Sequence, residues 1–140
     1  MAVKGSDNFV VVSFQGNDNI CQIGGMVIME IITNKLMEFY IDTLEKCGTY
    51  LLKMSDEDIE YIIFEEFDVG AISFLHDDTL AKLKEANLIT EEISQKSSVL
   101  RSNFLLLQNT DLWNVDSVRN SENWNEILKL SDEIKLLLHQ

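Results

Sequence analysis

The sequence SENWNEILKLSDEIKLLL, residues 121–138, combines the three signals of an amphipathic helix: a start, a period and a sufficient length. Ser121 is a favoured N-cap, because its hydroxyl accepts a hydrogen bond from a backbone N–H that has no partner within the helix. Apolar or small side chains then recur at a spacing of three or four residues, so we expect them to share one buried helix face. This face consists of Trp124, Ile127, Leu128, Ser131, Ile134 and Leu138.

The same signals predict further helices toward the N-terminus. Thr90 is an N-cap candidate, and the inner face of the helix that follows consists of Ile93, Ser97, Leu100, Phe104 and Leu107. Asp77 or Asp78 is expected to cap a shorter helix that ends near Asn87. The segment 109–120 between the last two long helices is polar and rich in turn residues, which predicts a loop.

Three segments between residues 9 and 75 leave more than one interpretation open. Phe9–Phe14 is β-branched and aromatic and precedes a turn cluster, which favours a strand, either alone or in a hairpin with Ile20–Ile23. Met26–Cys47 has helical spacing and is followed by Gly48, although Met26–Ile32 is rich enough in β-branched residues to form a strand. Val69–Leu75 is either a buried strand or an extended link.

These segments together predict a single, mainly α domain over residues 1–140. We expect about four to five helices with an N-terminal strand or β-hairpin, and the alternative is an α+β fold with a small sheet. The chain contains no Pro, which fits a helical fold because Pro inside a helix costs about 3 kcal/mol.

The charge is unevenly distributed along the chain. There are 24 acidic and 11 basic residues, which gives a net charge of −13 and argues against nucleic acid or an anionic membrane as a partner. Residues 55–81 contain nine acidic residues and no Lys or Arg. No uninterrupted apolar run approaches the roughly 20 residues of a membrane helix, so no membrane contact is expected.

Ser55 is the expected N-cap of a helix within this acid-only segment. At about 100° per residue, Ile59, Ile62, Ile63 and Phe67 fall on the core face. Tyr61 and Phe64 then stand outward among carboxylates, where aromatic rings would anchor a basic partner and carboxylates would steer it. The expected partner-binding residues are Asp56, Glu57, Asp58, Glu60, Tyr61, Phe64, Glu65, Asp68, Asp77 and Asp78. The plain alternative is a solvated face that keeps the chain soluble.

Catalytic and cofactor sites are not expected. His76 has Asp77 and Asp78 beside it, but no metal-binding pattern such as His-Glu-x-x-His is present, so we predict no metal, no cofactor and no enzyme activity. Gly24-Gly25 lacks the phosphate-binding pattern of glycine-rich loops. Cys21 and Cys47 are expected to be buried, reduced residues, and without a secretory signal we expect a cytoplasmic protein.

A small acidic chain whose acids concentrate in Ser55–Asp78, without catalytic motifs, resembles the general type of bacterial toxin-immunity protein. The resemblance implies a stoichiometric inhibitor that binds a basic toxin domain, often a nuclease, and blocks its active site or substrate-binding face. The rival hypotheses are a nucleic-acid mimic that inhibits another protein, a regulatory adaptor, and a small hydrolase that uses the acidic cluster.

Overall fold

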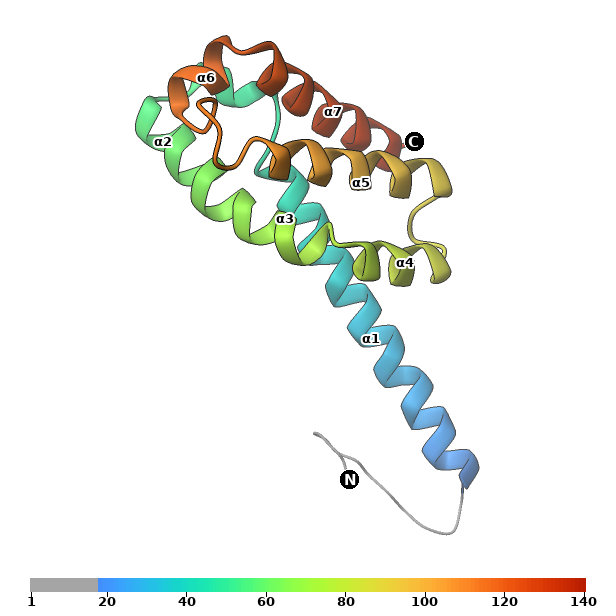
Figure 1. Ribbon diagram of the computed structural model, residues 1–140. Coiled ribbons are helices and arrows are strands. Elements are labelled where there is room, and N and C mark those ends of the chain that lie inside the picture. The colour runs from blue at the N-terminus through green and yellow to red at the C-terminus, as the bar shows by residue number, and fades with distance from the viewer. Residues whose placement is uncertain (1–17) are drawn as a thin grey trace. The chain divides into compact units, whose positions relative to one another are not determined.

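The computed structural model describes the backbone of residues 18–140 and the side chains of residues 31–140. The expected strand Phe9–Phe14 lies outside the described residues. Within them the chain is helical and contains no strand, which confirms a mainly α fold (Figure 1). The elements in chain order are α1 (Asp18–Glu45), the 3-10 helix η1 (Thr49–Lys53), α2 (Asp56–Tyr61), the π-helix η2 (Ile62–Phe67), α3 (Asp68–Phe74), α4 (Asp77–Glu85), α5 (Glu91–Leu106), α6 (Val115–Asn120) and α7 (Glu122–Leu138).

The chain divides into two compact units, Met1–Lys35 and Leu36–Gln140. In the described part of the first unit the backbone is helical from Asp18 onward as the beginning of α1. Residues 20–23 therefore do not form the second strand of a hairpin, and 26–32 is helix rather than strand, so the strand interpretation of both was wrong. Helix propagation explains this result, because each residue added to an existing helix gains one backbone hydrogen bond.

In the second unit α5 packs along α7, while α4 packs against α5 and α6 against α7 (Figure 1). The core of this unit contains a group of aromatic rings, with Trp124 fully buried. The Phe104 ring centroid lies 4.8 Å from that of Phe67 and 5.8 Å from that of Trp124. Trp124 Nε1 donates a hydrogen bond of 2.6 Å to the Leu112 carbonyl oxygen, so the burial of the indole leaves no donor unpaired.

The elements α2, η2 and α3 follow one another without a break and form one helix, Asp56–Phe74, which we call the long acidic helix. Val69–Leu75, for which the sequence favoured a strand or an extended link, is therefore helical up to Phe74. Ser55 is the N-cap as expected, and its hydroxyl accepts a hydrogen bond of 3.1 Å from the Asp58 backbone N–H.

The fully buried side chains of the long acidic helix, together with that of Leu75 directly after it, recur every four positions. A four-residue step in an α-helix overshoots a full turn by about 40°, so five such positions would drift by about 160°. The π-helix η2 has wider turns and rotates less per residue, which compensates for this drift. The fully buried positions are Ile59, Ile63, Phe67, Ala71 and Leu75.

Two predicted helix boundaries were wrong. His76, and not Asp77 or Asp78, is the N-cap of α4, and its Nδ1 accepts a hydrogen bond of 3.1 Å from the Asp78 N–H. The segment 109–120, predicted as a loop, contains the short helix α6, which is capped by the Asn114 side chain. Both caps are local side-chain to backbone hydrogen bonds that Asp or Ser would make equally well, so residue type alone does not select them.

No helix among the described residues has both the length and the apolar character that crossing a membrane requires.

Candidate functional site

Two adjoining hollows lie along the outer side of the long acidic helix, within residues 36–140. The first, about 400 Å³ in volume, lies between this helix and the C-terminal part of α1. The second, about 320 Å³, lies along α2, and the two hollows share Tyr61 and Glu65. We call them together the acidic groove. The first is lined by Phe39, Asp42, Thr43, Lys46, Tyr61, Glu65, Glu66, Val69, Gly70 and Phe74, and the second by Asp56, Glu57, Glu60, Tyr61 and Glu65.

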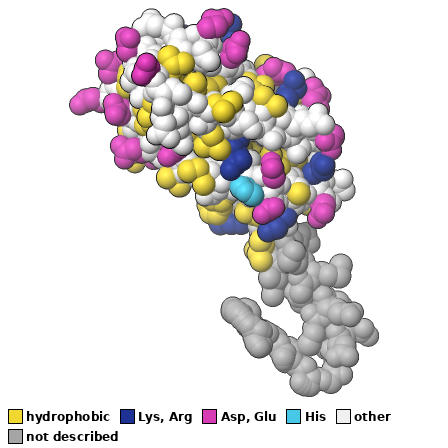
Figure 2. Space-filling view, in the orientation of Figure 1, with side chains coloured by type: hydrophobic (Ala, Val, Ile, Leu, Met, Phe, Trp, Pro, Cys, Tyr) yellow, Lys and Arg dark blue, Asp and Glu magenta, His cyan; other side chains and the backbone are white. Residues whose placement is uncertain are grey.

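The four-residue repeat of the long acidic helix builds the outer wall of the groove. The buried positions recur every four residues, and so do the exposed positions Glu57, Tyr61, Glu65 and Val69. Tyr61 is 52% exposed and Val69 is 64% exposed. The wall is therefore acidic at its α2 end and apolar at its α3 end. Figure 2 shows acidic side chains gathered near the beginning of α2, with hydrophobic side chains beside them along the same edge.

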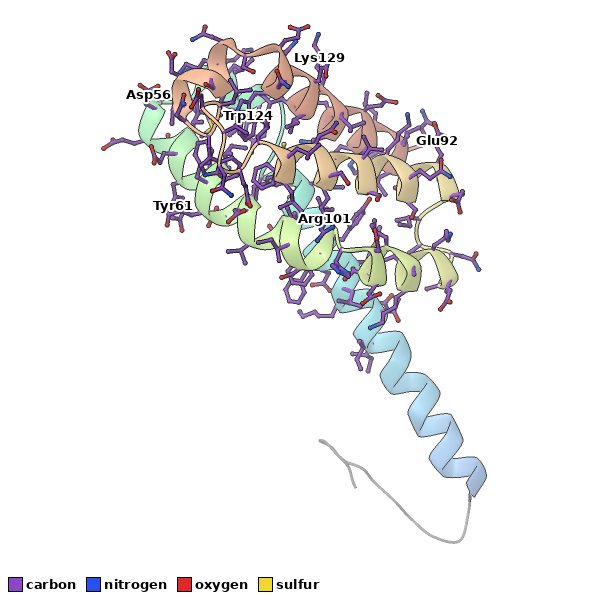
Figure 3. All side chains as sticks on the ribbon, viewed as in Figure 1. Asp56, Tyr61, Glu92, Arg101, Trp124 and Lys129 are labelled. Carbon is purple, nitrogen blue, oxygen red and sulfur yellow. The ribbon has the colours of Figure 1, made fainter. Side chains whose placement is uncertain are left out.

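Tyr61 stands at the junction of the two hollows. Figure 3 shows it directed outward from the long acidic helix, whereas Trp124 lies inside, among the helices. A hydrogen bond to Glu66 and the negative charges of Glu66 and Glu65 raise the pKa of the Tyr61 phenol. The ring therefore remains neutral at physiological pH and offers an uncharged π-face among carboxylates.

Some of the acidic residues are neutralised by basic residues from other segments. Arg119 of α6 contacts Asp56 at 2.8 Å, and Lys46, in the turn after α1, lies 3.6 Å from both Asp42 and Glu66. Among the described residues, Glu57, Asp58, Glu60 and Glu65 have no ion pair. The acid-only segment of the sequence is therefore partly, and not wholly, unpaired in the fold.

The helix dipole explains only part of this charge. Asp56, Glu57 and Asp58 lie in the first turn of α2, where a negative charge stabilises the helix by roughly 0.3–1 kcal/mol each. Glu60 and Glu65 lie beyond that turn, where the dipole contributes little. Neither glutamate has an ion pair among the described residues, so neither the helix dipole nor an ion pair accounts for them.

The floor of the first hollow depends on Gly70. It is buried against α1, and a Cβ atom at this position would lie only 2.4 Å from Thr43 Oγ1 and 3.0 Å from Thr43 Cβ. The absence of a side chain at residue 70 therefore permits the close contact between α1 and α3. Thr43 is held in place by its own hydrogen bond of 2.8 Å to the Phe39 carbonyl oxygen.

Five of the ten predicted site residues do not line the groove. Phe64 does not stand outward: it is half-buried, with its ring centroid 4.8 Å from that of Trp113 and 5.7 Å from that of Trp124. Asp68 is also half-buried and accepts a hydrogen bond of 2.9 Å from Gln108 Nε2. The sequence analysis assumed 100° per residue, which places residues 64 and 68 on the outer face. The π-helix η2 rotates less per residue, so both side chains turn toward the core.

Asp77 and Asp78 belong to α4 and are not part of the groove. Asp77 accepts a hydrogen bond of 3.4 Å from Ser98, and the Asp78 carboxylate lies 3.8 Å from His76. The groove keeps Asp56, Glu57, Glu60, Tyr61 and Glu65 of the predicted set. Asp58 lies on the same first turn of α2 but does not line either hollow.

The sequence did not reveal the opposite wall of the groove. This wall consists of Phe39 and Asp42 of α1 and of Lys46 in the turn that follows α1, at a spacing of three and four residues. That spacing marks one helix face, and Asp42 and Lys46 form an i,i+4 pair on it. The signal was present, but only the tertiary contact at Gly70 shows that this face meets the long acidic helix.

Within the described residues no group of His, Cys, Asp and Glu side chains is arranged to hold a metal ion. Cys47 is a free, fully buried thiol, as expected, and burial raises its pKa to about 12. Such burial is typical of a packing residue, because reactive thiols are partly exposed and have lowered pKa values. No protein-family model, curated protein or solved structure shows significant similarity to this chain.

Proposed function

We propose that this protein binds a basic protein partner stoichiometrically through the acidic groove and neutralises it by occlusion, as a toxin-immunity protein does. The observation that carries the proposal is the exposed Tyr61 ring with Glu57, Glu60 and Glu65 around it, none of which has an ion pair among the described residues. Such an arrangement suits a protein interface, where a buried aromatic anchor supplies affinity and carboxylates supply steering and specificity.

Electrostatics favour a cationic macromolecule over other partners. The net charge of −13 repels phosphates and anionic lipids, while it accelerates the encounter with a basic surface by roughly 10–10³-fold at low salt. The proposed partner is a toxin domain with a basic face, and the proposed compartment of the complex is the cytoplasm.

Affinity capture with matched charge-reversal variants tests the proposal. The groove variant carries Glu57→Lys, Glu60→Lys and Glu65→Lys, and the control variant carries Glu85→Lys, Glu122→Lys and Glu126→Lys, all at exposed positions. Each triple replacement changes the net charge by +6, from −13 to −7, so the two variants differ only in where the charge lies.

We expect the wild-type and control proteins to capture the same basic partner from the native host, and the groove variant to lose it. The purified partner should then inhibit growth or degrade nucleic acid, and one equivalent of this protein should abolish that activity. Capture of the partner by both variants alike would contradict the role of the groove. A partner whose activity persists at equimolar ratio would contradict neutralisation, and displacement of DNA from a non-toxic DNA-binding partner would favour the nucleic-acid mimic.

A further inference from the structure

We propose that the acidic groove receives a basic, amphipathic segment of its partner, which places an apolar side chain over Val69 and a flanking arginine or lysine over Tyr61. This inference rests on the proposed function and specifies the chemistry of the bound segment. The inference follows from the different linings of the two hollows, since one is partly apolar and the other is almost wholly acidic. A purely electrostatic contact would not need the apolar part.

The first hollow offers an apolar surface at its α3 end. The rings of Phe39 and Phe74 lie 5.0 Å apart between centroids, and Val69 stands beside them with 64% of its surface exposed. Gly70 adds no side chain to the floor, which keeps the hollow open. An apolar side chain of a partner would remove this surface from water, and apolar burial is the main source of binding free energy at interfaces.

The second hollow is suited to a cation. It is lined by carboxylates and by a single aromatic ring, that of Tyr61. A guanidinium or ammonium group over this ring would gain a cation–π contact and at the same time face Glu57, Glu60 and Glu65. A lysine or arginine of the partner would also suit the boundary between the hollows, because its aliphatic chain can cover apolar surface while its charged group stays near the carboxylates.

The ion pairs at the boundary of the first hollow are loose. Lys46 lies 3.6 Å from both Asp42 and Glu66, whereas Lys96 lies 2.6 Å from Glu133 elsewhere in the unit. A partner cation can therefore engage Asp42 without breaking a short hydrogen bond to Lys46. By contrast, a second copy of this chain brings another groove with the same carboxylates and another net charge of −13, so charge complementarity selects a basic partner and not self-association.

Nuclear magnetic resonance with the ¹⁵N-labelled full chain and two defined peptides tests this inference. The first probe is a helix-forming peptide with leucines on one face and arginines flanking them, and the second has the same composition in an order that disperses the leucines. We expect the amphipathic peptide to bind at least tenfold more tightly at 0.15 M salt. Its chemical-shift changes should centre on the amides of Tyr61, Glu65, Val69 and Gly70.

A pair of valine substitutions isolates the apolar contact. Val69→Asp places a negative charge in the groove, whereas Val99→Asp places the same charge on another exposed helical site, in α5. We expect Val69→Asp to weaken the amphipathic peptide about tenfold even though it adds attraction for a basic ligand, and Val99→Asp to leave its affinity within twofold. For the cation site, Glu60→Gln should likewise weaken the binding of the amphipathic peptide, whereas Glu126→Gln should leave its affinity within twofold.

Equal affinity for the two peptides, tighter binding to Val69→Asp, or shift changes outside the groove would overturn the inference. Concentration-dependent shifts of the groove amides without peptide would also overturn it, because a second copy would then be the occupant. These results leave the proposed function intact if the groove charge-reversal variant still loses the captured partner. Conversely, amphipathic peptide binding without any captured toxin would support the inference and contradict the proposed function.

Discussion

Helix α7 and the long acidic helix are similar in length but follow different rules. Helix α7 has a Ser cap, a regular α backbone, and a buried face at mixed spacings of three and four residues. The long acidic helix also has a Ser cap, but it contains a π-helix, buries every fourth residue, has no Lys or Arg, and exposes Tyr61 and Val69.

The difference separates a helix that follows the usual sequence rules throughout from one that departs from them. A helix whose pattern, caps and charges all agree needs no further explanation than the fold it stabilises. Departures from these rules concentrate at functional sites, and π-helical turns are frequent there. The following predictions test whether one side of the long acidic helix contributes to the free energy of unfolding and the other side does not.

The largest effect is expected for Trp124 of α7, whose indole packs against the Phe64 ring of the long acidic helix. Trp124→Ala should lower the free energy of unfolding by about 3–5 kcal/mol, because it empties a fully buried site among aromatic rings. Tyr61→Ala, on the outer side, should change it by less than about 1 kcal/mol. Urea denaturation followed by circular dichroism measures both, and similar losses for the two variants would mean that Tyr61 is a core residue.

A second prediction concerns pH and the α7 side of the core. Burial raises the pKa of Cys47 from 9.0 to about 12, so the unfolded thiol loses its proton first as the pH rises. The stabilisation is complete below pH 9 and is lost between pH 9 and about 12, on the order of a few kcal/mol at about 1.4 kcal/mol per pKa unit. Tyr40, whose pKa burial raises to about 12, should add to this alkaline loss.

The variant Cys47→Ala isolates the thiol contribution. Its free energy of unfolding, measured in urea from pH 7 to 11, should fall less steeply with pH than that of the wild type. Parallel slopes would show that the thiol is accessible to water in the folded protein.

The contact between α1 and α3 gives a third, smaller effect. Gly70→Ala should cost about 1–3 kcal/mol in spite of its better helix propensity, because the added methyl group overlaps Thr43. Thr43→Ala removes the two closest obstructing atoms, Oγ1 and Cγ2, and leaves only Cβ at 3.0 Å, so Gly70→Ala should cost less in that background than in the wild type. Additive effects of the two substitutions in thermal unfolding would refute the steric explanation.

The smallest effect should come from the unpaired glutamates. The triple change Glu57→Gln, Glu60→Gln and Glu65→Gln should alter stability by less than about 1 kcal/mol, because the relief of repulsion between like charges opposes the loss of one negative charge from the first turn of α2. Any gain should vanish at 1 M salt, where the Debye length is about 3 Å. A loss of more than about 1 kcal/mol would assign these carboxylates to the fold and remove the reason to regard them as a binding surface.

The sequence predicted the regular helices well because their signals are local. Ser55, Thr90 and Ser121 are N-caps as expected, and the buried faces of α5 and α7 contain the residues that the spacing indicated. Caps and periods depend on neighbours within about one turn, so they can be read without the tertiary structure.

The candidate site was only half predictable. Its acidic wall follows from the absence of Lys and Arg in residues 55–81, but α geometry misplaced Phe64 and Asp68 because a π-helix has no recognised sequence signature here. The α1 wall depends on one glycine, Gly70, that lets two helices meet. Pairing of Asp56 with Arg119 likewise joins residues 63 positions apart, which composition cannot reveal.

The wide turns of η2 also bear on how this helix tolerates insertions and deletions. Removing Glu66 would shorten the intervals between its buried positions to four, three, four and four, which an ordinary α-helix accommodates with little drift. A deletion of one residue here would therefore keep the later buried positions on the core side of the helix. The same deletion in the middle of α7 would rotate every later side chain by about 100°. Length variation among natural variants of this chain is thus expected to gather between Tyr61 and Asp68.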